Sequence, residues 1–336
     1  MTGLGHTPTI EEKDTGVMVD FPRIIGFCPR EEEPMLTRTV ANPLTTLERR
    51  ALQSLSTPDG GMLIVAADQR NGMKAAIPDA PGGPDAITRE ELSAVKADLV
   101  RHLAVHAPAI LLDPEVALPA VVDDGVLDRD TALVVGLDAS GFETVDGLRY
   151  TRFVPGVTPR TVRELGGGVA KMLYYTRPDR QGRDSRVADE MRALIAECEA
   201  EGLLLIVELL TYRLDDETEE EYADAFPALV AEGAALAVAA GAKILKLQYP
   251  GSAEASAAVT EAAQGVPWAV LSAGVDHETF IGQVTTAVAN GAAGAMAGRS
   301  LWKDSLSYDA ARREELLTTR ALPRLRELAA AVDGRG

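Results

Sequence analysis

Short apolar runs alternate with longer stretches of helical period from about Leu44 to the end of the chain. The helical stretches include Arg89–His106, Ser185–Glu201, Glu219–Ala240 and Thr279–Asn290. The apolar runs are Met62–Asp68, Ala109–Asp113, Ala132–Asp138, Val169–Tyr175, Leu203–Thr211, Ala242–Tyr249, Trp268–Ala273 and Ala293–Arg299. Eight strands that each precede a helix predict an α/β fold, the closed (β/α)₈ or TIM barrel.

Residues at the ends of the helical stretches agree with this pattern. Thr88 and Glu91 have the spacing of a capping box, and Gly202, Gly241 and Gly291 each end a helical stretch just before an apolar run. An open, doubly wound sheet is the structural alternative. It usually has fewer strands and often a glycine-rich phosphate loop after the first strand, and the first run here has no such loop. The pattern therefore favours the barrel.

The first part of the chain, up to about Pro43, has mixed charge, several prolines and no sustained period. We interpret residues 1–43 as an N-terminal extension that is partly ordered at Phe21–Cys28, and residues 44–336 as the barrel domain.

Composition narrows the classes of partner. Hydrophobic residues make up 46% and charged residues 25% of the 336 residues, which is ordinary for a globular protein with a sizeable core. The formal net charge of −18 repels nucleic acid and anionic lipid, so neither is an expected partner. An anionic substrate would therefore need a local basic pocket.

The lack of a recognisable targeting signal and the spacing of the cysteines predict a cytoplasmic protein. Cys28 and Cys198 are far apart and lack the spacing of a metal site, so we expect two reduced thiols. No apolar run reaches bilayer length, and the N-terminus lacks the pattern of a signal peptide. Subunit number is open, and a homo-oligomer is possible.

The most informative residue is Lys246, which interrupts an apolar run. Side chains alternate along a strand, so Lys246 shares one face with Ile244 and Gln248, while Leu245 and Leu247 share the other. If the leucines pack on the helices, Lys246 points into the barrel. Burial lowers the pKa of an amine, and a neutral amine attacks carbonyl carbon. The alternative is a structural lysine that reaches the rim or pairs with a carboxylate.

Two further ionisable residues lie in apolar runs. Lys171 obeys the same logic two strands earlier, and we expect like-charge repulsion between the two lysines to favour a neutral amine. Glu208 supplies the opposite charge, either as a proton shuttle or as the counter-ion of the lysines.

Aspartates end the first three runs. We interpret Asp113 and Asp138 as caps of the following helices. Asp68 is a stronger candidate for the site because Gln69 and Arg70 follow it and give it hydrogen-bonding neighbours.

The last two runs end in small residues, Ser272 and Gly274 after the seventh and Gly298 before Arg299 in the eighth. Loops at these positions of a barrel commonly bind phosphate through backbone N–H groups, and an arginine adds a charge-assisted contact. Close helix packing is the alternative reason for small residues.

Metal chemistry has little support in the sequence. Of the four histidines, only His102 and His106 have a ligand-like spacing, and they lie within a helical stretch without a carboxylate in register. We therefore expect no metal and no cofactor.

Several stretches together resemble the bacterial class I tagatose-1,6-bisphosphate aldolase family and its relative, sulfofructosephosphate aldolase. These stretches are AADQRNGMK (66–74), AILLDPEVALPA (109–120), AKMLYYTRPD (170–179), VELLTY (207–212), ILKLQYP (244–250), LSAGVD (271–276) and AGRSLW (297–302). The resemblance runs from about Leu44 to Val332. It implies a ketose phosphate substrate.

The resemblance also implies roles for named residues. Lys246 corresponds to the lysine that forms the Schiff base, while Lys171 and Glu208 transfer protons or shape the site. Asp68 and Gln69 are implied in holding the hydroxyl groups or carbonyl end of the substrate. The phosphate is implied to lie against Ser272, Gly274, Gly298 and Arg299, with Arg70 the next candidate for the anion.

The chain departs from the family at three points. Gln248 stands where the family usually has an acidic residue, and the loop between Pro250 and Pro267 is shorter than in many members. The N-terminal extension has no counterpart that we can place. These departures concern the sugar more than the chemistry.

The function expected from all of this is cleavage of a ketose 1,6-bisphosphate of the tagatose type to dihydroxyacetone phosphate and an aldehyde such as glyceraldehyde 3-phosphate. The alternatives are cleavage of sulfofructose 1-phosphate or another ketose 1-phosphate, and a non-catalytic barrel that senses a metabolite. A reactive lysine argues against the sensor, and the missing ligands argue against a metal-dependent lyase.

Overall fold

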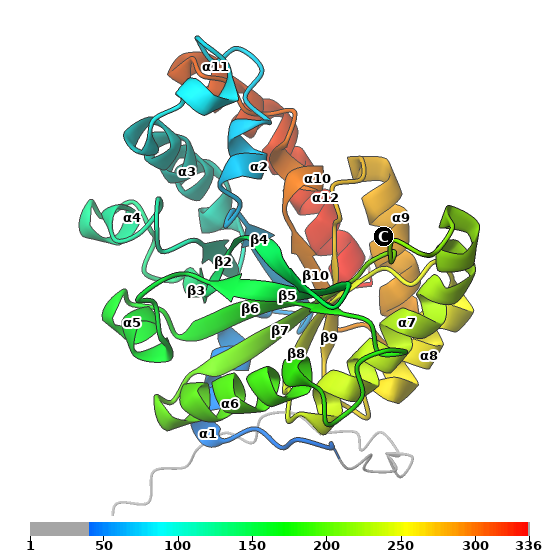
Figure 1. Ribbon diagram of the computed structural model, residues 1–336. Coiled ribbons are helices and arrows are strands. Elements are labelled where there is room, and N and C mark those ends of the chain that lie inside the picture. The colour runs from blue at the N-terminus through cyan, green and yellow to red at the C-terminus, as the bar shows by residue number, and fades with distance from the viewer. Residues whose placement is uncertain (1–39, 335–336) are drawn as a thin grey trace, which may run out of the picture. The chain divides into compact units, whose positions relative to one another are not determined.

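The computed structural model describes residues 40–334, whose central feature is a closed barrel of eight parallel strands (Figure 1). Around the barrel the strands are β1 (Met62–Ala66), β2 (Ala109–Leu112), β3 (Ala132–Gly136), β6 (Val169–Thr176), β7 (Leu204–Thr211), β8 (Ile244–Gln248), β9 (Trp268–Leu271) and β10 (Gly294–Ala297). Each strand falls on one of the eight predicted runs, so the predicted barrel is confirmed.

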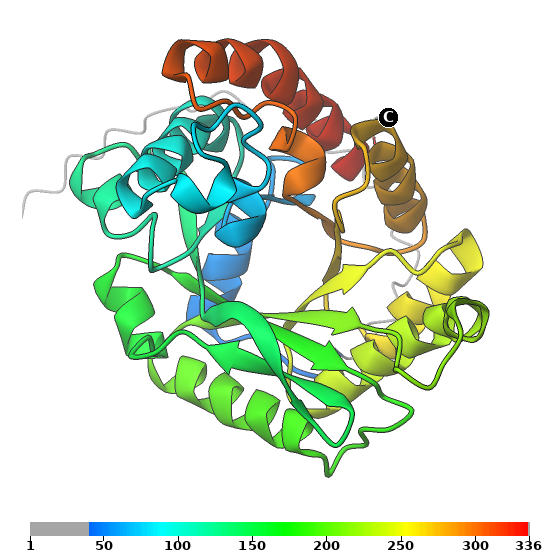
Figure 2. The ribbon, with the colours of Figure 1, turned by 45° about the horizontal axis from the view of Figure 1, so that its top comes forward.

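Helices surround the barrel on its outer side (Figure 2). They are α2 (Asn71–Lys74), α3 (Arg89–Leu103), α4 (Ala120–Asp123), α5 (Pro159–Glu164), α6 (Arg186–Ala200), α7 (Glu219–Ala239), α8 (Ala253–Ala262), α9 (His277–Ala289), α10 (Arg299–Trp302), α11 (Ala310–Leu316) and α12 (Leu322–Val332). Before β1 comes α1 (Thr46–Ser54), whose Ala51 and Leu52 pack against the residues that fill the barrel interior. Single helical turns lie at Pro84–Ala86, Ala104–His106 and Leu317–Ala321. The predicted capping box of Thr88 and Glu91 is present at the start of α3.

Alternate side chains of the strands pack into two separate hydrophobic cores. Residues such as Ile64 and Ile244 fill the barrel interior, and Leu55, just after α1, packs with them. Leu245 and Leu247 belong to the larger core between the strands and the helices. Because both leucines face the helices, the residue between them must point into the barrel. The expected orientation of Lys246 is therefore confirmed.

A β-hairpin follows β3, where we expected a helix to follow directly. It consists of β4 (Asp138–Val145) and β5 (Leu148–Phe153), and α5 comes only after it. Its two-residue turn, Asp146-Gly147, has positive φ at both positions, which is the turn that joins tightly paired strands. The Asp-Gly pair was the sequence signal that could have revealed the hairpin.

Aromatic contacts hold this hairpin against the barrel. The ring of Phe142 meets the ring of Tyr175 on β6 edge to face, with 5.2 Å between centroids. The guanidinium of Arg149 lies 4.6 Å from the ring centroid of Tyr212, just after β7. In Figure 1 the hairpin crosses in front of β6.

One helix of the described part of the chain, α7, is long and apolar enough to cross a membrane by length and composition alone. Its buried residues include Leu229, Val230 and Leu236, which belong to the core around the barrel. A helix that packs on a barrel meets the same criterion. The expected order at Phe21–Cys28 lies outside the described residues, and the domain boundary near Pro43 stays a prediction.

The close approach of the β10 backbone to β1 at a glycine gives a test of the β1–β10 pairing. At Gly294, where φ is +152°, an added Cβ would lie 1.9 Å from the carbonyl oxygen of Met62. We expect Gly294→Ala to lower the free energy of unfolding by about 3 kcal/mol, because the two strands must move apart. Urea-induced unfolding measures this loss.

Gly282 is the matched control, because it lies exposed within α9 and an added Cβ would meet nothing within 4 Å. Gly282→Ala should raise stability by roughly 0.5–1 kcal/mol. Equal effects of the two substitutions would contradict the close approach of β1 and β10.

Candidate active site

Two lysines and three carboxylates meet inside the barrel near the carboxyl ends of the strands. The Nζ of Lys171 on β6 lies 3.0 Å from Asp68, 2.9 Å from Asp138 and 2.7 Å from Glu208 on β7. The Nζ of Lys246 on β8 lies 3.0 Å from the same oxygen of Glu208. The structure therefore brings together Lys171, Lys246, Glu208 and Asp68, all of which the sequence singled out.

Strand register explains how two of these residues come to be neighbours. Glu208 and Lys246 are direct partners in the parallel pairing of β7 with β8, so their side chains leave the sheet on the same face. Lys171 is 2% exposed and Lys246 is 4% exposed. At this depth each charge needs an opposite charge close by.

The electrostatics of Lys171 differ from our expectation. Burial alone would lower its pKa, but Asp138, Asp68 and Glu208 outweigh that effect and raise the pKa well above its usual value. Burial likewise opposes ionisation of Asp68 and Glu208, yet Lys171 and Lys246 lower the pKa of both carboxyl groups. Lys171 is therefore held as an ammonium ion, and the repulsion that we expected between the lysines does not make it neutral.

Asp138 corrects a second expectation. We expected it to cap a helix, but it begins β4, and its carboxylate accepts hydrogen bonds from Lys171 and from the backbone N–H of Leu173. Asp138 is thus a site residue that the sequence reasoning missed together with the hairpin.

Asp113 does not cap a helix as we expected, because it lies in the turn before α4, and α4 begins only after Pro119. Its Oδ1 accepts from the backbone N–H groups of Glu115 and Val116, in the turn that precedes α4. Its other oxygen pairs with Lys96 of α3, which was not expected from the sequence.

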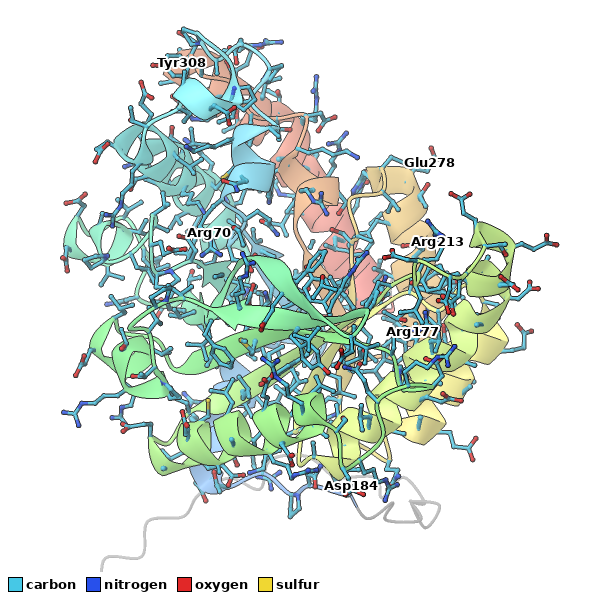
Figure 3. The ribbon with its side chains drawn as sticks, viewed as in Figure 1. Arg70, Arg177, Asp184, Arg213, Glu278 and Tyr308 are labelled. Carbon is cyan, nitrogen blue, oxygen red and sulfur yellow. The ribbon has the colours of Figure 1, made fainter. Side chains whose placement is uncertain are left out.

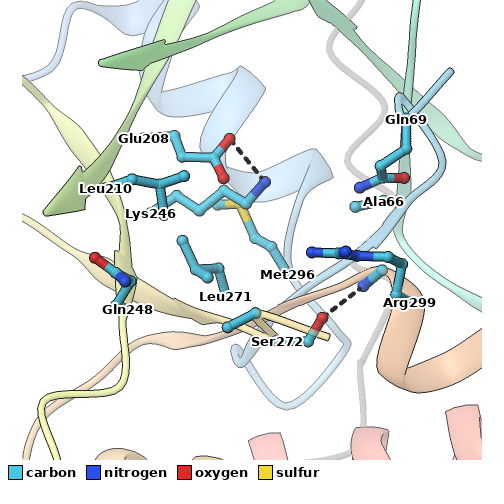
Figure 4. Close-up of a pocket in the computed structure, with 12 residues that line it drawn as sticks. Ala66, Gln69, Glu208, Leu210, Lys246, Gln248, Leu271, Ser272, Met296 and Arg299 are labelled. Carbon is cyan, nitrogen blue, oxygen red and sulfur yellow. Dashed lines mark hydrogen bonds and ion pairs between the residues drawn. The ribbon is translucent and has the colours of Figure 1, made fainter. Parts of the chain in front are cut away.

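A cavity of about 270 Å³ opens next to Lys246 (Figure 4). Its polar lining comes from strand ends on opposite sides of the barrel: Gln69, Glu208, Lys246, Gln248, Ser272 and Arg299. Leu210, Leu271 and Met296 supply apolar walls. The volume and the mixed lining suit a small polar molecule.

Small residues and an arginine form one end of the cavity. Ser272 accepts a weak hydrogen bond of 3.4 Å from the backbone N–H of Gly298. Gly274 does not itself line the cavity, but it has φ +85°, and a Cβ there would lie 3.2 Å from the Cζ of Arg299. Within residues 40–334, Arg299 is exposed and forms no ion pair with a carboxylate. This end can therefore offer a free cation and backbone donors to an anion.

Gln69 and Arg70, two neighbouring candidates in the segment after β1, have different surroundings. Gln69 lines the cavity, and its Oε1 and the Oδ1 of Asp68 are buried without a hydrogen-bond partner among the described residues. Arg70 instead pairs with Glu115 at 2.7 Å and donates to the backbone oxygen of Asp138. Arg70 thus links Glu115 to the start of the hairpin and does not line the cavity.

Histidines do not contribute to this site in the described part of the chain. His102 lies in the last turn of α3, His106 in the turn after it, and His277 pairs with Glu327 at the surface. Within residues 40–334, no group of three or more His, Cys, Asp and Glu side chains is placed to hold a metal ion.

Comparison with known proteins agrees with the geometry. The chain is 27% identical over 309 residues to tagatose 1,6-diphosphate aldolase of Lactococcus lactis subsp. lactis, covering 82% of this chain and 92% of that protein. It is 28% identical over 312 residues to the protein of the same name from Streptococcus pneumoniae, covering 82% and 92%.

Solved structures match in fold. An archaeal fructose 1,6-bisphosphate aldolase superposes with a TM-score of 0.58 at 19% identity, covering 86% of this chain and 99% of that one. The fructose-bisphosphate aldolase of Plasmodium falciparum superposes with a TM-score of 0.61 at 14% identity, covering 88% and 98%. The family model described as DeoC/LacD family aldolase matches residues 62–304, which is most of the barrel. The chain therefore belongs to the DeoC/LacD family of aldolases, enzymes that act on carbon–carbon bonds.

Proposed function

We propose that this aldolase works by the class I mechanism, with Lys246 forming an imine with a ketose 1,6-bisphosphate of the tagatose type. The products are dihydroxyacetone phosphate and glyceraldehyde 3-phosphate. The relatives named tagatose 1,6-diphosphate aldolases support this choice of substrate.

One observation carries the choice of Lys246 over Lys171. Lys246 lines the cavity and has one carboxylate within 3.0 Å, whereas three carboxylates hold Lys171 as an ammonium ion. A nucleophilic amine must be neutral and must reach the substrate. Lys246 meets the second condition, and Glu208 is placed to accept its proton.

The amine of Lys246 adds to the ketose carbonyl to give a carbinolamine. The proton that Glu208 accepted from Lys246 then passes to the departing oxygen, and loss of water leaves an iminium ion. As the bond between C3 and C4 breaks, the C4 hydroxyl gives its proton to a carboxylate, for which Glu208 is the nearest candidate, and the bonding electrons form an enamine. Protonation at C3 and hydrolysis release dihydroxyacetone phosphate. Asp68 Oδ1 and Gln69 Oε1, which have no hydrogen-bond partner among residues 40–334, can accept hydrogen bonds from substrate hydroxyl groups.

The imine on Lys246 can be trapped. Borohydride in the presence of dihydroxyacetone phosphate should modify the wild-type protein on Lys246, as shown by peptide mass mapping. Lys246→Met should lose both the label and cleavage, because it keeps the length of the side chain without the amine. Label on Lys171, or near-normal cleavage by Lys246→Met, would overturn the assignment.

Chelation gives an independent test of the class. Cleavage should continue after treatment with EDTA, because the iminium accepts the electrons for which a Lewis acid would otherwise be needed. Initial rates before and after treatment decide the matter. Loss of turnover that added zinc restores would contradict the class I mechanism.

Arg299, with Ser272, Gly274 and Gly298, is proposed to hold the phosphate of the dihydroxyacetone half. Charge-assisted contacts to phosphate contribute on the order of 1.5–3 kcal/mol each, so Arg299→Ala should weaken binding of dihydroxyacetone phosphate by roughly ten- to a hundredfold. Calorimetry measures this, and dihydroxyacetone without phosphate should still be trapped on Lys246.

Arg326→Ala on α12 is the matched control, because this exposed arginine lies outside the cavity lining and its loss changes the net charge equally. It should bind the phosphate normally. Normal binding by Arg299→Ala as well would place the anion elsewhere.

A further inference from the structure

Lys96 of α3 is a fully buried charge whose contacts all lie behind the active site. It is 0% exposed, and its Nζ donates to the carbonyl oxygen of Ala67 at 2.7 Å, to that of Gln69 at 2.9 Å and to the carboxylate of Asp113. An ammonium group has three N–H donors, so this one is fully used. Among the described residues, it is the only lysine bound in this way to the segment that carries Asp68.

Burying a charged side chain on a helix that packs against the barrel costs free energy. The other buried side chains of α3 are apolar, for example Leu92 and Leu99, and burial lowers the pKa of Lys96 although Asp113 opposes the shift. A buried ion pair often stabilises a protein no better than apolar residues of the same volume. Stability alone therefore does not account for a lysine at this position.

The segment after β1 has few other constraints. The strand ends at Ala66, and beyond it the backbone pairs with β2 only through Ala67, whose N–H donates to Leu111. The two carbonyl groups that Lys96 binds lie on either side of Asp68. Holding both of them sets the direction in which the Asp68 side chain leaves the backbone.

We propose that Lys96, oriented by Asp113, is a positioning residue for the active site. It fixes residues 67–69 so that Asp68 reaches Lys171 and Gln69 lines the cavity. The inference rests on the proposed function in that Asp68 and Gln69 are taken to hold the substrate. Lys96 itself lies outside the cavity lining and touches no reacting atom.

The first test compares Lys96→Met with a matched control. Arg313 of α11 is also a buried cation that binds an aspartate, Asp98, and two backbone carbonyls, those of Ser307 and Tyr308. Tyr308 lies at the outer end of the molecule beside α11 (Figures 1 and 3). Both substitutions should lower the melting temperature. Lys96→Met should also lower kcat by about ten- to a hundredfold, as a displacement of roughly 1 Å can, whereas Arg313→Met should leave kcat within about twofold.

A double-mutant cycle then asks whether Lys96 acts through Asp68. Asp68→Asn should itself lower kcat, and adding Lys96→Met to it should change kcat by less than about twofold, because the group being positioned is already gone. Lys96→Arg keeps a charged donor and should recover part of kcat. Fully additive effects, or a Lys96→Met kcat equal to that of Arg313→Met, would overturn the proposal.

A crystal structure of Lys96→Met decides the question even if the Asp68→Asn protein is too slow to assay. Residues 67–69 should be displaced and Asp68 withdrawn from Lys171. An unchanged segment would refute the positioning role. Failure to trap an imine in the wild-type protein would instead count against the proposed function, and the displacement would still test Lys96.

Discussion

The structure depends on the compensation of charge inside the barrel. Four contacts of 2.7–3.0 Å join the amino groups of Lys171 and Lys246 to the carboxylates of Asp68, Asp138 and Glu208, in a region that strands enclose on every side. Removal of one member of a buried pair costs about 3–5 kcal/mol, because its partner is left unpaired. The five side chains therefore form one unit, and their positions on β4, β6, β7 and β8 and just after β1 are coupled.

This unit sits on an apolar base. Below the charges, Ile206, Ile244 and Met296 fill the interior, and Leu55 packs with them. Because these side chains fill the lower part of the interior, a cavity can open only at the carboxyl ends of the strands. Barrel enzymes bind their substrates at this end. The cavity thus owes its location to the layer of side chains beneath it.

Loops around the cavity are held from outside the barrel. Trp302 donates from its indole N–H to the carbonyl of Ala66, and Lys96 donates to the carbonyls of Ala67 and Gln69. Arg70 joins Glu115 to the start of the hairpin. These donors replace the strand pairing that ends at the top of β1. Buried or half-buried polar groups on the outer side of the strands therefore share in shaping the inner site.

The sequence by itself determined the eight strands, the inward direction of Lys246 and the location of small residues beside Arg299. These features follow from local alternation and from the rule that parallel strands end at one edge, so they need no knowledge of distant contacts. The hairpin was also encoded locally, in Asp146-Gly147, but the repeat of strand and helix hid it. Tertiary structure alone decided that Asp138 joins Lys171, that Asp113 pairs with Lys96, and that Lys171 stays charged. The reason is physical: which charges become partners, and hence which pKa values rise or fall, depends on the closure of strands that lie far apart in the chain.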